Sequence, residues 1–458
     1  MEQSKKYQLK QCVYEATLAC NLRCRHCGSS AGKPRKDELS TSEATELFGQ
    51  LAALGCEKLT ISGGEPMLRK DWPELIASAA QTGMRVGMIT NAVSFNEEAA
   101  RSAKANGLRA VGFSLDGLRE VHDRIRGKVG HYERIRRAMK AAAKVELPFA
   151  IVTFVNSLNL THLDDLYQLV REQGAFAWQI QLGANMGNMK NNQDLLINEH
   201  QLLAFHAKLA RLIRRGDLRI DVGDCIGYYG PEETTLRKNI GGRPFSGCGA
   251  GIRVVGIESN GNVKGCLSIM AGYNSEGQRY VEGNIRESSL EEIWQRDDAF
   301  AYNRQWSQDS MDGFCRDCRH VRNCRGGCRS NMVACGQGEE NPMCVYRILS
   351  KRQRATNGAG KAAAVLFASV LGSQMAGCSD SESVSLYDMP FDGGADAAPA
   401  DDTDSSFDTE NIAFYGIPDT GAVDTSNVEV YGIPDTETES EQNTNAARYE
   451  VPDPDSPE

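Results

Sequence analysis

The first 185 residues alternate short runs of aliphatic and β-branched residues with longer helical patterns, and this alternation limits the possible folds more than any other feature. The runs predict six strands: Val13–Leu18, Leu59–Ser62, Val86–Thr90, Val111–Leu115, Phe149–Val155 and Trp178–Leu182. Thr41–Leu54 is typical of the segments between them, because Ser40 and Glu43 form a predicted capping box at its start and Gly55 follows it. The repeated strand–helix units predict an α/β fold with a parallel sheet, either doubly wound or a partial barrel.

Chemically unusual residues follow four of these strands, and parallel sheets gather their sites at the carboxyl ends of the strands. The segments are Cys20, Cys24 and Cys27 after the first strand, Ser62-Gly63-Gly64-Glu65-Pro66 at the second, Thr90-Asn91 at the third and Ser114-Leu115-Asp116-Gly117 at the fourth. Any one of them alone is readily interpreted as a turn. Four at successive strand ends indicate one shared site.

The three cysteines after the first strand have a spacing, C-x3-C-x2-C, that suits a [4Fe–4S] cluster. A redox disulfide needs two cysteines, and a structural zinc site usually needs four ligands. Three thiolates leave one iron of a cubane without a protein ligand, and a small molecule can bind there and be activated. The triplet therefore indicates a reactive centre, with zinc as the alternative.

The charge of the chain is divided unevenly. The formal net charge is −10, but residues 379–458 carry −20 and the first 378 residues carry +10. The 15 cysteines group at metal-ligand spacings in a long chain that starts without an apolar signal segment, which predicts a reducing cytoplasm rather than a secreted disulfide scaffold. We expect no nucleic-acid partner for the basic part, because the acidic tail is itself a polyanion that would meet it.

A second cysteine array begins more than 200 residues after the first. Its members are Cys248, Cys266, Cys315, Cys318, Cys324, Cys328 and Cys344. Asn260-Gly261 lies between two apolar runs and predicts a hairpin just before the second of these cysteines. Zinc ribbons are the alternative to iron–sulfur clusters in this region.

The first half of the chain resembles the radical S-adenosylmethionine (radical SAM) superfamily in its cysteine triplet and its strand ends. The resemblance implies a partial (β/α)6 barrel of the TIM type, in which Cys20, Cys24 and Cys27 hold a [4Fe–4S] cluster and S-adenosylmethionine binds the open iron. The implied cofactor contacts are His26 beside the adenine, Gly63, Gly64, Glu65 and Pro66 near the amino group, Asn91, Ser114 and Asp116 near the ribose and carboxylate, and Arg126 or Arg124 as a carboxylate clamp. The implied chemistry is reductive cleavage of the cofactor to a 5′-deoxyadenosyl radical.

The second array resembles the SPASM extension of radical SAM enzymes that modify peptides and proteins. The resemblance implies a first auxiliary cluster at Cys248, Cys266 and Cys328 and a second auxiliary cluster at Cys315, Cys318, Cys324 and Cys344. Some relatives carry a further cysteine where this chain has Val254, so the first auxiliary cluster has an open iron or another ligand. Cys225 and Cys335 are spare thiols that could supply it. We expect three [4Fe–4S] clusters and an external electron donor such as flavodoxin or ferredoxin.

Residues 351–378 have the layout of a secretory signal. Basic residues from Lys351 to Lys361 precede an uncharged run over 362–377, which closes as Met375-Ala376-Gly377-Cys378. The last four residues resemble a bacterial lipobox, which makes Cys378 a candidate lipidation site. The alternative is a helix that packs on the enzyme or lies on a membrane through 362–378, because the run is short for a membrane span.

The acidic tail over 379–458 is predicted to be disordered, because its net charge is high and it has few residues that could form a core. One motif recurs in it, a tyrosine followed two residues later by an aliphatic residue and then by proline, with aspartate within two further residues. The four tyrosines are Tyr387, Tyr415, Tyr431 and Tyr449. Repeated targets of a modifying enzyme explain this pattern, and duplication within a low-complexity tail is the alternative.

Together these patterns predict a radical SAM maturase joined to a tail that resembles a lipoprotein-type precursor peptide. The predicted parts are a barrel over 1–225, a SPASM domain over 226–350, a signal-like segment over 351–378 and a substrate-like tail over 379–458. The enzyme part is expected in the cytoplasm, with the tail destined for export. The join is either a true fusion or two adjacent reading frames run together.

Three other functions fit parts of the sequence. A maturase of a separate protein, as in anaerobic sulfatase maturation, and a haem-precursor oxidoreductase both resemble this layout. A membrane-anchored electron-transfer protein would use the clusters but not the Gly-Gly-Glu-Pro and Ser-Leu-Asp-Gly segments. No catalytic acid or base is identified: Asp221, Asp224 and Cys225 lie where a substrate base would sit, but a structural role is the simpler interpretation.

Overall fold

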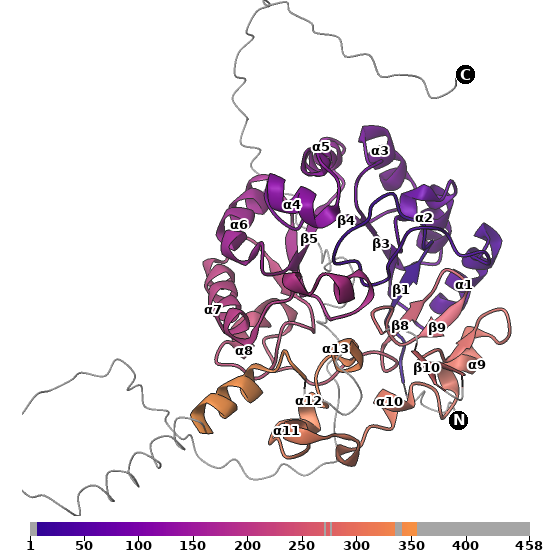
Figure 1. Ribbon diagram of the computed structural model, residues 1–458. Helices are drawn as coiled ribbons and strands as arrows, with labels where there is room; N and C mark the ends of the chain where they lie inside the picture. The colour runs from indigo at the N-terminus through magenta and orange to yellow at the C-terminus, as the bar shows by residue number, and fades with distance from the viewer. Residues whose placement is uncertain (1–6, 270–271, 275–276, 335–340, 355–458) are drawn as a thin grey trace, which may run out of the picture. The chain divides into compact units, whose positions relative to one another are not determined.

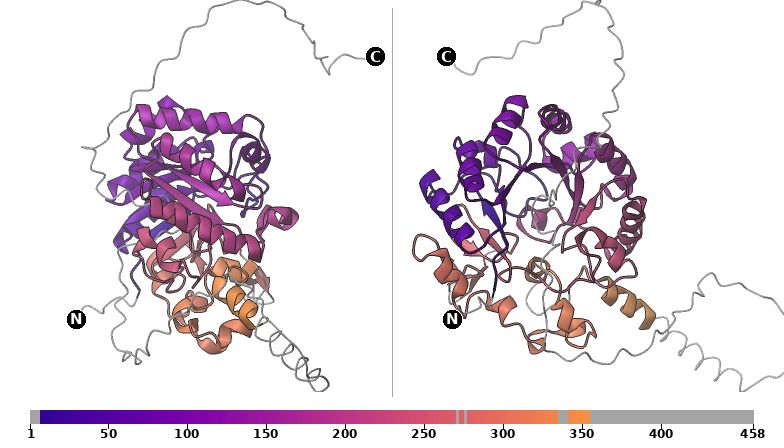
Figure 2. Two further views of the ribbon diagram at one scale, coloured as in Figure 1. Left: turned by 90° about the vertical axis from the view of Figure 1, so that its left-hand side faces the viewer. Right: turned by 180° about the vertical axis from the view of Figure 1, so that it is seen from behind.

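The computed structural model describes residues 7–269, 272–274, 277–334 and 341–354. Its centre is a curved sheet whose outer face is covered by helices (Figures 1 and 2). The first seven strands lie side by side in chain order and run parallel: β1 (Gln11–Glu15), β2 (Lys58–Ser62), β3 (Arg85–Thr90), β4 (Ala110–Ser114), β5 (Phe149–Val155), β6 (Ala177–Leu182) and β7 (Ile220–Val222). The predicted parallel α/β fold is confirmed, in its partial-barrel form.

Helices connect successive strands of the barrel. They are α1 (Thr41–Ala53), α2 (Trp72–Gln81), α3 (Glu97–Ala105), α4 (Arg119–Arg126), α5 (His131–Lys144), α6 (Leu163–Glu172) and α7 (Glu199–Arg215), with short 3-10 turns η1 (Pro66–Leu68), η2 (Leu160–His162), η3 (Gly187–Asn191) and η4 (Gln193–Leu195). The predicted capping box of α1 is present: Ser40 Oγ accepts a hydrogen bond from the Glu43 backbone at 3.3 Å, and Glu43 Oε2 accepts one from the Ser40 backbone at 2.8 Å. Phe48 of α1 packs edge-on against Tyr14 of β1, both fully buried.

The second half of the chain extends the same sheet. β8 (Val254–Ile257) pairs in parallel with β1 on the side opposite β2, and β9 (Asn262–Lys264) pairs antiparallel with β8. The hairpin that Asn260-Gly261 predicts is therefore confirmed, with Gly261 in the left-handed region at a φ of 89°. β12 (Gly283–Asn284) completes this edge of the sheet, and β10 (Gly272–Asn274) and β11 (Gly277–Arg279) form a separate pair.

Short helices make up much of the rest of the second half, and two of them contain Cys315 (α11) and Cys324 (α12). They are α8 (Glu233–Leu236), α9 (Leu290–Gln295), α10 (Ala301–Arg304), α11 (Gly313–Arg316), α12 (Val321–Cys324) and α13 (Arg329–Ala334), with 3-10 turns η5 (Lys238–Ile240) and η6 (Gln308–Ser310), and residues 345–354 are also helical. The predicted boundary between residues 225 and 226 falls in the loop after β7. Because β8 joins β1, hydrogen bonds of one sheet connect the two predicted domains.

Several predictions concern residues outside the described ranges. They are most of the signal-like segment with Cys378, the acidic tail with Tyr387, Tyr415, Tyr431 and Tyr449, and the spare thiol Cys335. Among the residues that the structure does describe, none of the helices is both long enough and apolar enough to cross a membrane.

The predicted first strand is shifted. β1 begins two residues before Val13 and ends at Glu15, because residues 16–19 leave the strand and are held by the turn after β2. The backbone N–H of Gly64 donates to Thr17 O at 2.7 Å, and that of Glu65 donates to Ala19 O at 2.7 Å. This bracing brings the segment that leads to the first cysteine triplet against the turn of the second strand.

Candidate functional site

A cavity of about 340 Å³ opens at the carboxyl ends of the parallel strands. Its walls include ten residues that the sequence analysis singled out: Cys20, Cys24, His26, Cys27, Gly63, Gly64, Asn91, Ser114, Asp116 and Arg126. Glu65 and Pro66 do not line it. Residues more than 100 positions apart in the sequence therefore meet at one site, as the parallel topology predicts.

The loop with the cysteine triplet is tied to its surroundings through the backbone. The N–H of Arg25 donates to Ile125 O at 2.9 Å, and the N–H of Asn188 donates to Cys27 O at 2.9 Å. Burial raises the pKa of Cys24 to about 11, against which the charge of Arg126 acts. Iron would replace the thiol proton on binding. Backbone hydrogen bonds thus hold the loop that places three cysteines around one cavity.

The two glycines of the second strand end allow a close backbone approach. A Cβ atom at Gly64 would overlap the backbone oxygen of Ala19, and one at Gly63 would overlap that of Thr17. Gly63 also has a φ of 145°, which disfavours any side chain. Glycine is therefore needed at both positions, because the segment that precedes the cysteine triplet packs directly against their backbone.

Glu65 acts behind the cavity wall. Its Oε1 accepts hydrogen bonds from Thr90 Oγ1 at 2.6 Å and from the Met67 backbone at 3.3 Å, and its Oε2 accepts one from the Asn91 backbone at 2.7 Å. Burial raises the pKa of Glu65 to about 7, while these hydrogen bonds favour the ionised form. Glu65 thereby fixes the backbone of Asn91, and Pro66 begins the short turn η1 beside it.

Asp116 and Arg126 form a buried ion pair in the cavity wall, with 2.6 Å between Oδ2 and Nε. Burial alone would raise the pKa of Asp116, but the nearby Arg126, His26 and His122 and the hydrogen bond from the Phe154 backbone together hold it below its usual range. Arg126 also donates through Nη1 to Cys24 Sγ at 3.8 Å. Arg124, the other candidate clamp, is exposed and does not line the cavity. Of the two arginines, Arg126 is the one at the site.

His26 lies between an aromatic ring and this ion pair. Its ring stacks on Phe154 with 4.6 Å between the ring centroids, and its Nε2 lies 3.7 Å from Asp116 Oδ2. Burial lowers the pKa of His26 to about 4, so the ring is neutral near pH 7. One ring face is covered by Phe154, which orients the imidazole in the cavity wall.

Two histidines that the sequence analysis did not single out connect two strand ends. The Asp116 N–H donates to His122 Nδ1 at 3.1 Å, His122 Nε2 is 2.7 Å from His131 Nδ1, and His131 Nε2 is 2.8 Å from Asn91 O. The first donor is a backbone N–H, so His122 carries its proton on Nε2 and His131 carries its own on Nε2. Both rings are fully buried. This histidine pair holds Asp116 and Asn91 at a set separation.

The four cysteines predicted for the second auxiliary cluster come together. Cys315, Cys318, Cys324 and Cys344 line one pocket of about 20 Å³. Aromatic rings form most of the remaining wall: Tyr228, Tyr229, Phe314, His320 and Tyr346. Burial raises the pKa of Cys324 well above its usual value, with further contributions from the other three thiols. Four thiols in one small aromatic enclosure suit a fully ligated cluster.

The charge of Cys248 acts on the other two cysteines predicted for the first auxiliary cluster. Burial and the charge of Cys248 raise the pKa of Cys266 to about 11, and the same two causes are the largest that raise the pKa of Cys328 well above its usual value. Ser268 and Ser330, each two residues after one of these cysteines, line the cavity that holds the first triplet. The described residues contain no group of three His, Cys, Asp or Glu side chains placed to hold a single metal ion. A cubane does not require such a group, because each of its thiolate ligands binds a different iron.

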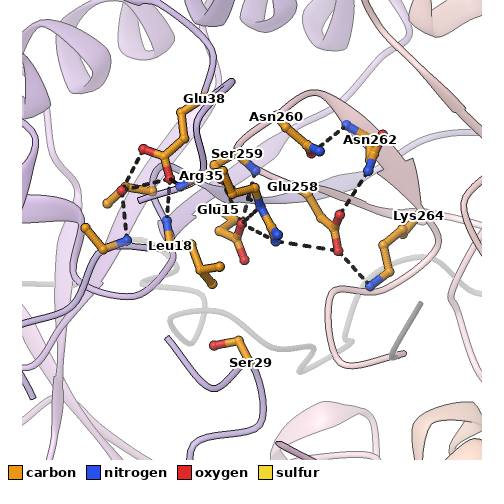
Figure 3. A network of polar contacts seen from close by, with 12 residues as sticks. Glu15, Leu18, Ser29, Arg35, Glu38, Glu258, Ser259, Asn260, Asn262 and Lys264 are labelled. Atoms are coloured by element: carbon orange, nitrogen blue, oxygen red, sulfur yellow. Dashed lines mark hydrogen bonds and ion pairs between the residues drawn. The ribbon is translucent and has the colours of Figure 1, made fainter. Parts of the chain in front are cut away.

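A polar network connects the first triplet's segment to the second array (Figure 3). Glu15 Oε1, at the end of β1, lies 2.9 Å from Arg35 Nη2 and accepts a hydrogen bond from the Ser259 backbone at 3.1 Å. Glu258 Oε1 lies 3.9 Å from the same Arg35 nitrogen and 3.1 Å from Nζ of the buried Lys264. Lys264 precedes Cys266 by two residues, so the network couples the positions of the two cysteine regions.

Comparisons with known proteins agree with this geometry. The Radical SAM superfamily profile matches residues 14–170, and the SPASM profile, described as an iron-sulfur cluster-binding domain, matches residues 248–319. An AdoMet-dependent heme synthase of Methanosarcina barkeri is 28% identical, over 73% of this chain and 96% of its own. The mycofactocin maturase MftC of Mycobacterium ulcerans is 29% identical, over 72% of this chain and 85% of its own.

Solved structures share the fold at lower identity. SuiB of Streptococcus suis bound to S-adenosylmethionine has a TM-score of 0.58 at 17% identity, and covers 74% of this chain and 76% of its own. Native anSMEcpe with bound AdoMet also has a TM-score of 0.58 at 17% identity, and covers 77% of this chain and 99% of its own.

Proposed function

This chain is a radical SAM enzyme with a SPASM domain and [4Fe–4S] clusters, and on that premise we propose that it modifies a ribosomally made peptide at Tyr-x-x-Pro-Asp repeats like those of its own tail. The observation that supports this proposal is the cavity of about 340 Å³, because residues of both cysteine regions share its walls. Leu267, Ser268 and Ser330 line it from the region of the second array, and Cys20, Cys24 and Cys27 line it from the amino-terminal half of the chain. A substrate in this cavity would lie between the two.

Cys20, Cys24 and Cys27 would hold the cluster that binds S-adenosylmethionine, which when bound and reduced supplies a 5′-deoxyadenosyl radical for hydrogen abstraction. Arg126 would bind the cofactor carboxylate, since a guanidinium matches a carboxylate and Asp116 keeps this one oriented. Asn91 and Ser114 would bind its polar groups from neighbouring strand ends. Gly63 and Gly64 would offer backbone atoms to the amino group.

Charge supports the tail-like substrate. The first 378 residues carry +10 and the tail carries −20, so the two attract each other at close range. The only tyrosines of the tail fall in the four repeats, at Tyr387, Tyr415, Tyr431 and Tyr449. A radical directed at these residues would give a carbon–carbon or ether crosslink, an epimerisation or a backbone excision. A thioether within a repeat is not expected, because the repeats contain no cysteine.

Mass spectrometry of the tail tests this proposal. The full chain, with its clusters reconstituted, is incubated in deuterium oxide with S-adenosylmethionine and reductant, and residues 379–458 are then released by proteolysis. Deuterium oxide is needed because epimerisation leaves the mass unchanged in ordinary water. We expect a mass change or deuterium incorporation in at least one repeat, and none in the Cys20→Ala variant. Unchanged repeats in a protein that still cleaves S-adenosylmethionine would refute the tail as substrate.

A haem-precursor oxidoreductase is the second candidate, because the AdoMet-dependent heme synthase of Methanosarcina barkeri aligns over 96% of its length. An iron–porphyrin carboxylate would then be the substrate, and the tail would be incidental. Deleting residues 379–458 separates the two candidates. Formation of haem from an iron-porphyrin precursor at an unchanged rate in the truncated protein would favour this candidate over peptide modification.

The external electron donor is proposed to be a flavodoxin or a ferredoxin, since the clusters need single electrons at low potential. Membrane association through 362–378 and lipidation at Cys378 are proposed only on the sequence pattern of that segment.

A further inference from the structure

Glu15 and Gln181 line the cavity but belong to none of the proposed cofactor contacts. Glu15 ends β1, and Gln181 is the last residue but one of β6. Val13, two residues before Glu15, also lines the cavity, because every second side chain of a strand points to the same face. Four other strands lie between β1 and β6 in the curved sheet, so the two residues reach the cavity from separate parts of its wall (Figure 1).

Glu15 uses one of its two carboxylate oxygens to bind the protein. Its Oε1 accepts hydrogen bonds from Arg35 Nε at 3.2 Å and Nη2 at 2.9 Å, and from the Ser259 backbone at 3.1 Å and Oγ at 3.0 Å (Figure 3). In the part of the chain that the structure describes, Oε2 has no hydrogen-bond partner and is not fully shielded. Because Glu15 is only 6% exposed and lines the cavity, Oε2 is available on the cavity side.

The partners of Oε1 lie behind the cavity wall. Neither Arg35 nor Ser259 lines the cavity. An ionised carboxylate is costly to bury unless a cation or hydrogen bonds compensate it, and Arg35 provides both for Glu15. A group bound in the cavity would therefore meet the free carboxylate oxygen rather than the arginine that pairs with it.

Gln181 offers an amide to the same cavity. The residue is half-buried, and no hydrogen bond to its amide is found among the described residues. A Cβ atom at Gly223 would lie 3.4 Å from Cγ of Gln181, so the stem of this side chain packs against the loop after β7. The N–H of Gly223 donates to Ile180 O at 2.9 Å, which ties that loop to β6. The stem is thus held while the amide keeps both its acceptor and its donors.

These two side chains suit the backbone of a peptide. Each peptide group has one N–H donor and one C=O acceptor, and either of them loses free energy when it is buried without a partner. Glu15 Oε2 can accept from an N–H, and the Gln181 amide can bond either group of a neighbouring peptide unit. An ionised carboxylate of a substrate would instead be repelled by Glu15.

We propose that Glu15 and Gln181 bind the backbone of the peptide substrate from two sides of the cavity, with Glu15 Oε2 accepting a hydrogen bond from a peptide N–H. The inference rests on the proposed peptide substrate and names its backbone as the part that is recognised. The four repeats of the tail support this, because they differ at the two positions between tyrosine and proline: Asp-Met, Gly-Ile twice, and Glu-Val. Contacts to the backbone accept all of these side chains.

Two nearly isosteric variants of the full chain test the proposal. Glu15→Gln keeps an oxygen for Arg35 and Ser259, and it turns an N–H donor towards the cavity in place of the acceptor. Gln181→Leu removes the amide at similar volume. Each variant is compared with the parent in its affinity for a labelled peptide, Tyr-Gly-Ile-Pro-Asp-Thr, which has the sequence of residues 415–420. Affinity for S-adenosylmethionine and the number of modified repeats per 5′-deoxyadenosine are measured beside it.

We expect both variants to bind the peptide about tenfold more weakly and to modify correspondingly fewer repeats per 5′-deoxyadenosine. Affinity for S-adenosylmethionine and total formation of 5′-deoxyadenosine should stay within about twofold of the parent. Unchanged peptide affinity in Glu15→Gln would overturn the proposal. A loss of affinity for S-adenosylmethionine instead would also overturn it, because the carboxylate would then contact the cofactor.

Ser259→Ala is the matched control, since it removes a donor to Glu15 Oε1 and leaves Oε2 in place. Its peptide affinity should stay within about twofold of the parent; weakening equal to that of Glu15→Gln would assign the effect to the network behind the wall and overturn the proposal. A parent that binds the peptide but modifies no repeat would refute the proposed function alone, because the affinities of the variants still decide the backbone contacts. A parent that does not bind the peptide would overturn both.

Discussion

The first cysteine triplet and the four cysteines predicted for the second auxiliary cluster differ in what surrounds their sulfur atoms. The first triplet borders a cavity of about 340 Å³ with a buried ion pair, amide groups and a histidine in its walls. The four cysteines Cys315, Cys318, Cys324 and Cys344 border a pocket of about 20 Å³ enclosed by aromatic rings. The triplet therefore has space and polar side chains for a ligand beside it, whereas the four cysteines have little free space and mostly aromatic neighbours.

We propose that this difference separates chemistry at the first triplet from electron transfer at the four cysteines. A reactive cluster needs room for its cofactor and substrate and charged groups that orient them. A cluster that passes electrons needs a rigid, water-poor enclosure, which sets its potential through burial and hydrogen bonds. Under this proposal the same residue type would serve two purposes, and the surrounding side chains would decide which.

The largest expected effect comes from removing one thiol in each region. Cys20→Ala should abolish cleavage of S-adenosylmethionine, with a loss of at least about a thousandfold, because the cofactor loses its cluster. Cys318→Ala should remove about four irons from the enclosed site yet keep cofactor cleavage within about tenfold of the parent. Formation of 5′-deoxyadenosine and iron analysis measure both. Equal losses of cleavage in the two variants would contradict the division of roles.

Breaking the buried ion pair should have the next largest effect. Arg126→Gln leaves Asp116 buried without its partner, and we expect a loss of roughly 3–5 kcal/mol in the free energy of unfolding. Binding of S-adenosylmethionine should weaken as well. Arg124→Gln is the matched control, since this arginine is exposed on the same helix α4, and its effect should stay within about 0.5 kcal/mol. Denaturant unfolding and equilibrium binding measure the two quantities, and similar results for both arginines would remove Arg126 from the site.

The histidine pair should affect cofactor binding more mildly. His131→Phe removes the donor to Asn91 O and the acceptor for His122, so we expect the KM for S-adenosylmethionine to rise about tenfold with kcat nearly unchanged. His131→Gln can keep the donor and should lie between the parent and the phenylalanine variant. A fall in kcat at constant KM would show that the pair does more than position Asn91.

The effect of His131→Phe on the free energy of unfolding should depend on pH. Burial lowers the pKa of His131 to about 4, so the unfolded chain takes up a proton at this residue near pH 6.5 while the folded chain stays neutral. Stability from this residue is therefore complete above pH 6.5 and is lost as the pH falls towards 4, by up to about 3 kcal/mol. The difference in unfolding free energy between the parent and His131→Phe should shrink over that range. A difference that is independent of pH would show that His131 already carries a proton in the fold.

The smallest effect is expected in the aromatic enclosure. The ring of His320 stacks on Tyr229 at 4.1 Å, and its backbone N–H donates to Cys318 Sγ at 3.4 Å. His320→Leu should shift the midpoint potential of the second auxiliary cluster, because the wall becomes more apolar, and leave cofactor cleavage within about twofold. A redox titration followed by electron paramagnetic resonance measures the shift. A large loss of cleavage would mean that the two regions are not separate.

Much of the architecture could be predicted because its signals are local. Hydrophobic runs at regular intervals predicted six parallel strands, and the bounds of Phe149–Val155 were correct to the residue. The cysteine spacing and the glycine pair pointed to the cavity, because parallel strands bring their carboxyl ends to one edge whatever the details of packing. The resemblance grouped Cys315, Cys318, Cys324 and Cys344, and in the structure the four line one pocket.

What the sequence determines by itself is thus the order of the elements and the types of reactive residue at their ends. The tertiary structure decides which residues face each other: Arg126 rather than Arg124 at the cavity, Glu65 behind Asn91, and β8 against β1. It also pairs His122 with His131 and, among the described residues, leaves Oδ2 of the buried Asp224 without a hydrogen-bond partner. The physical reason is that burial, charge pairing and hydrogen bonding depend on distances between segments remote in the chain, and no local pattern encodes those distances.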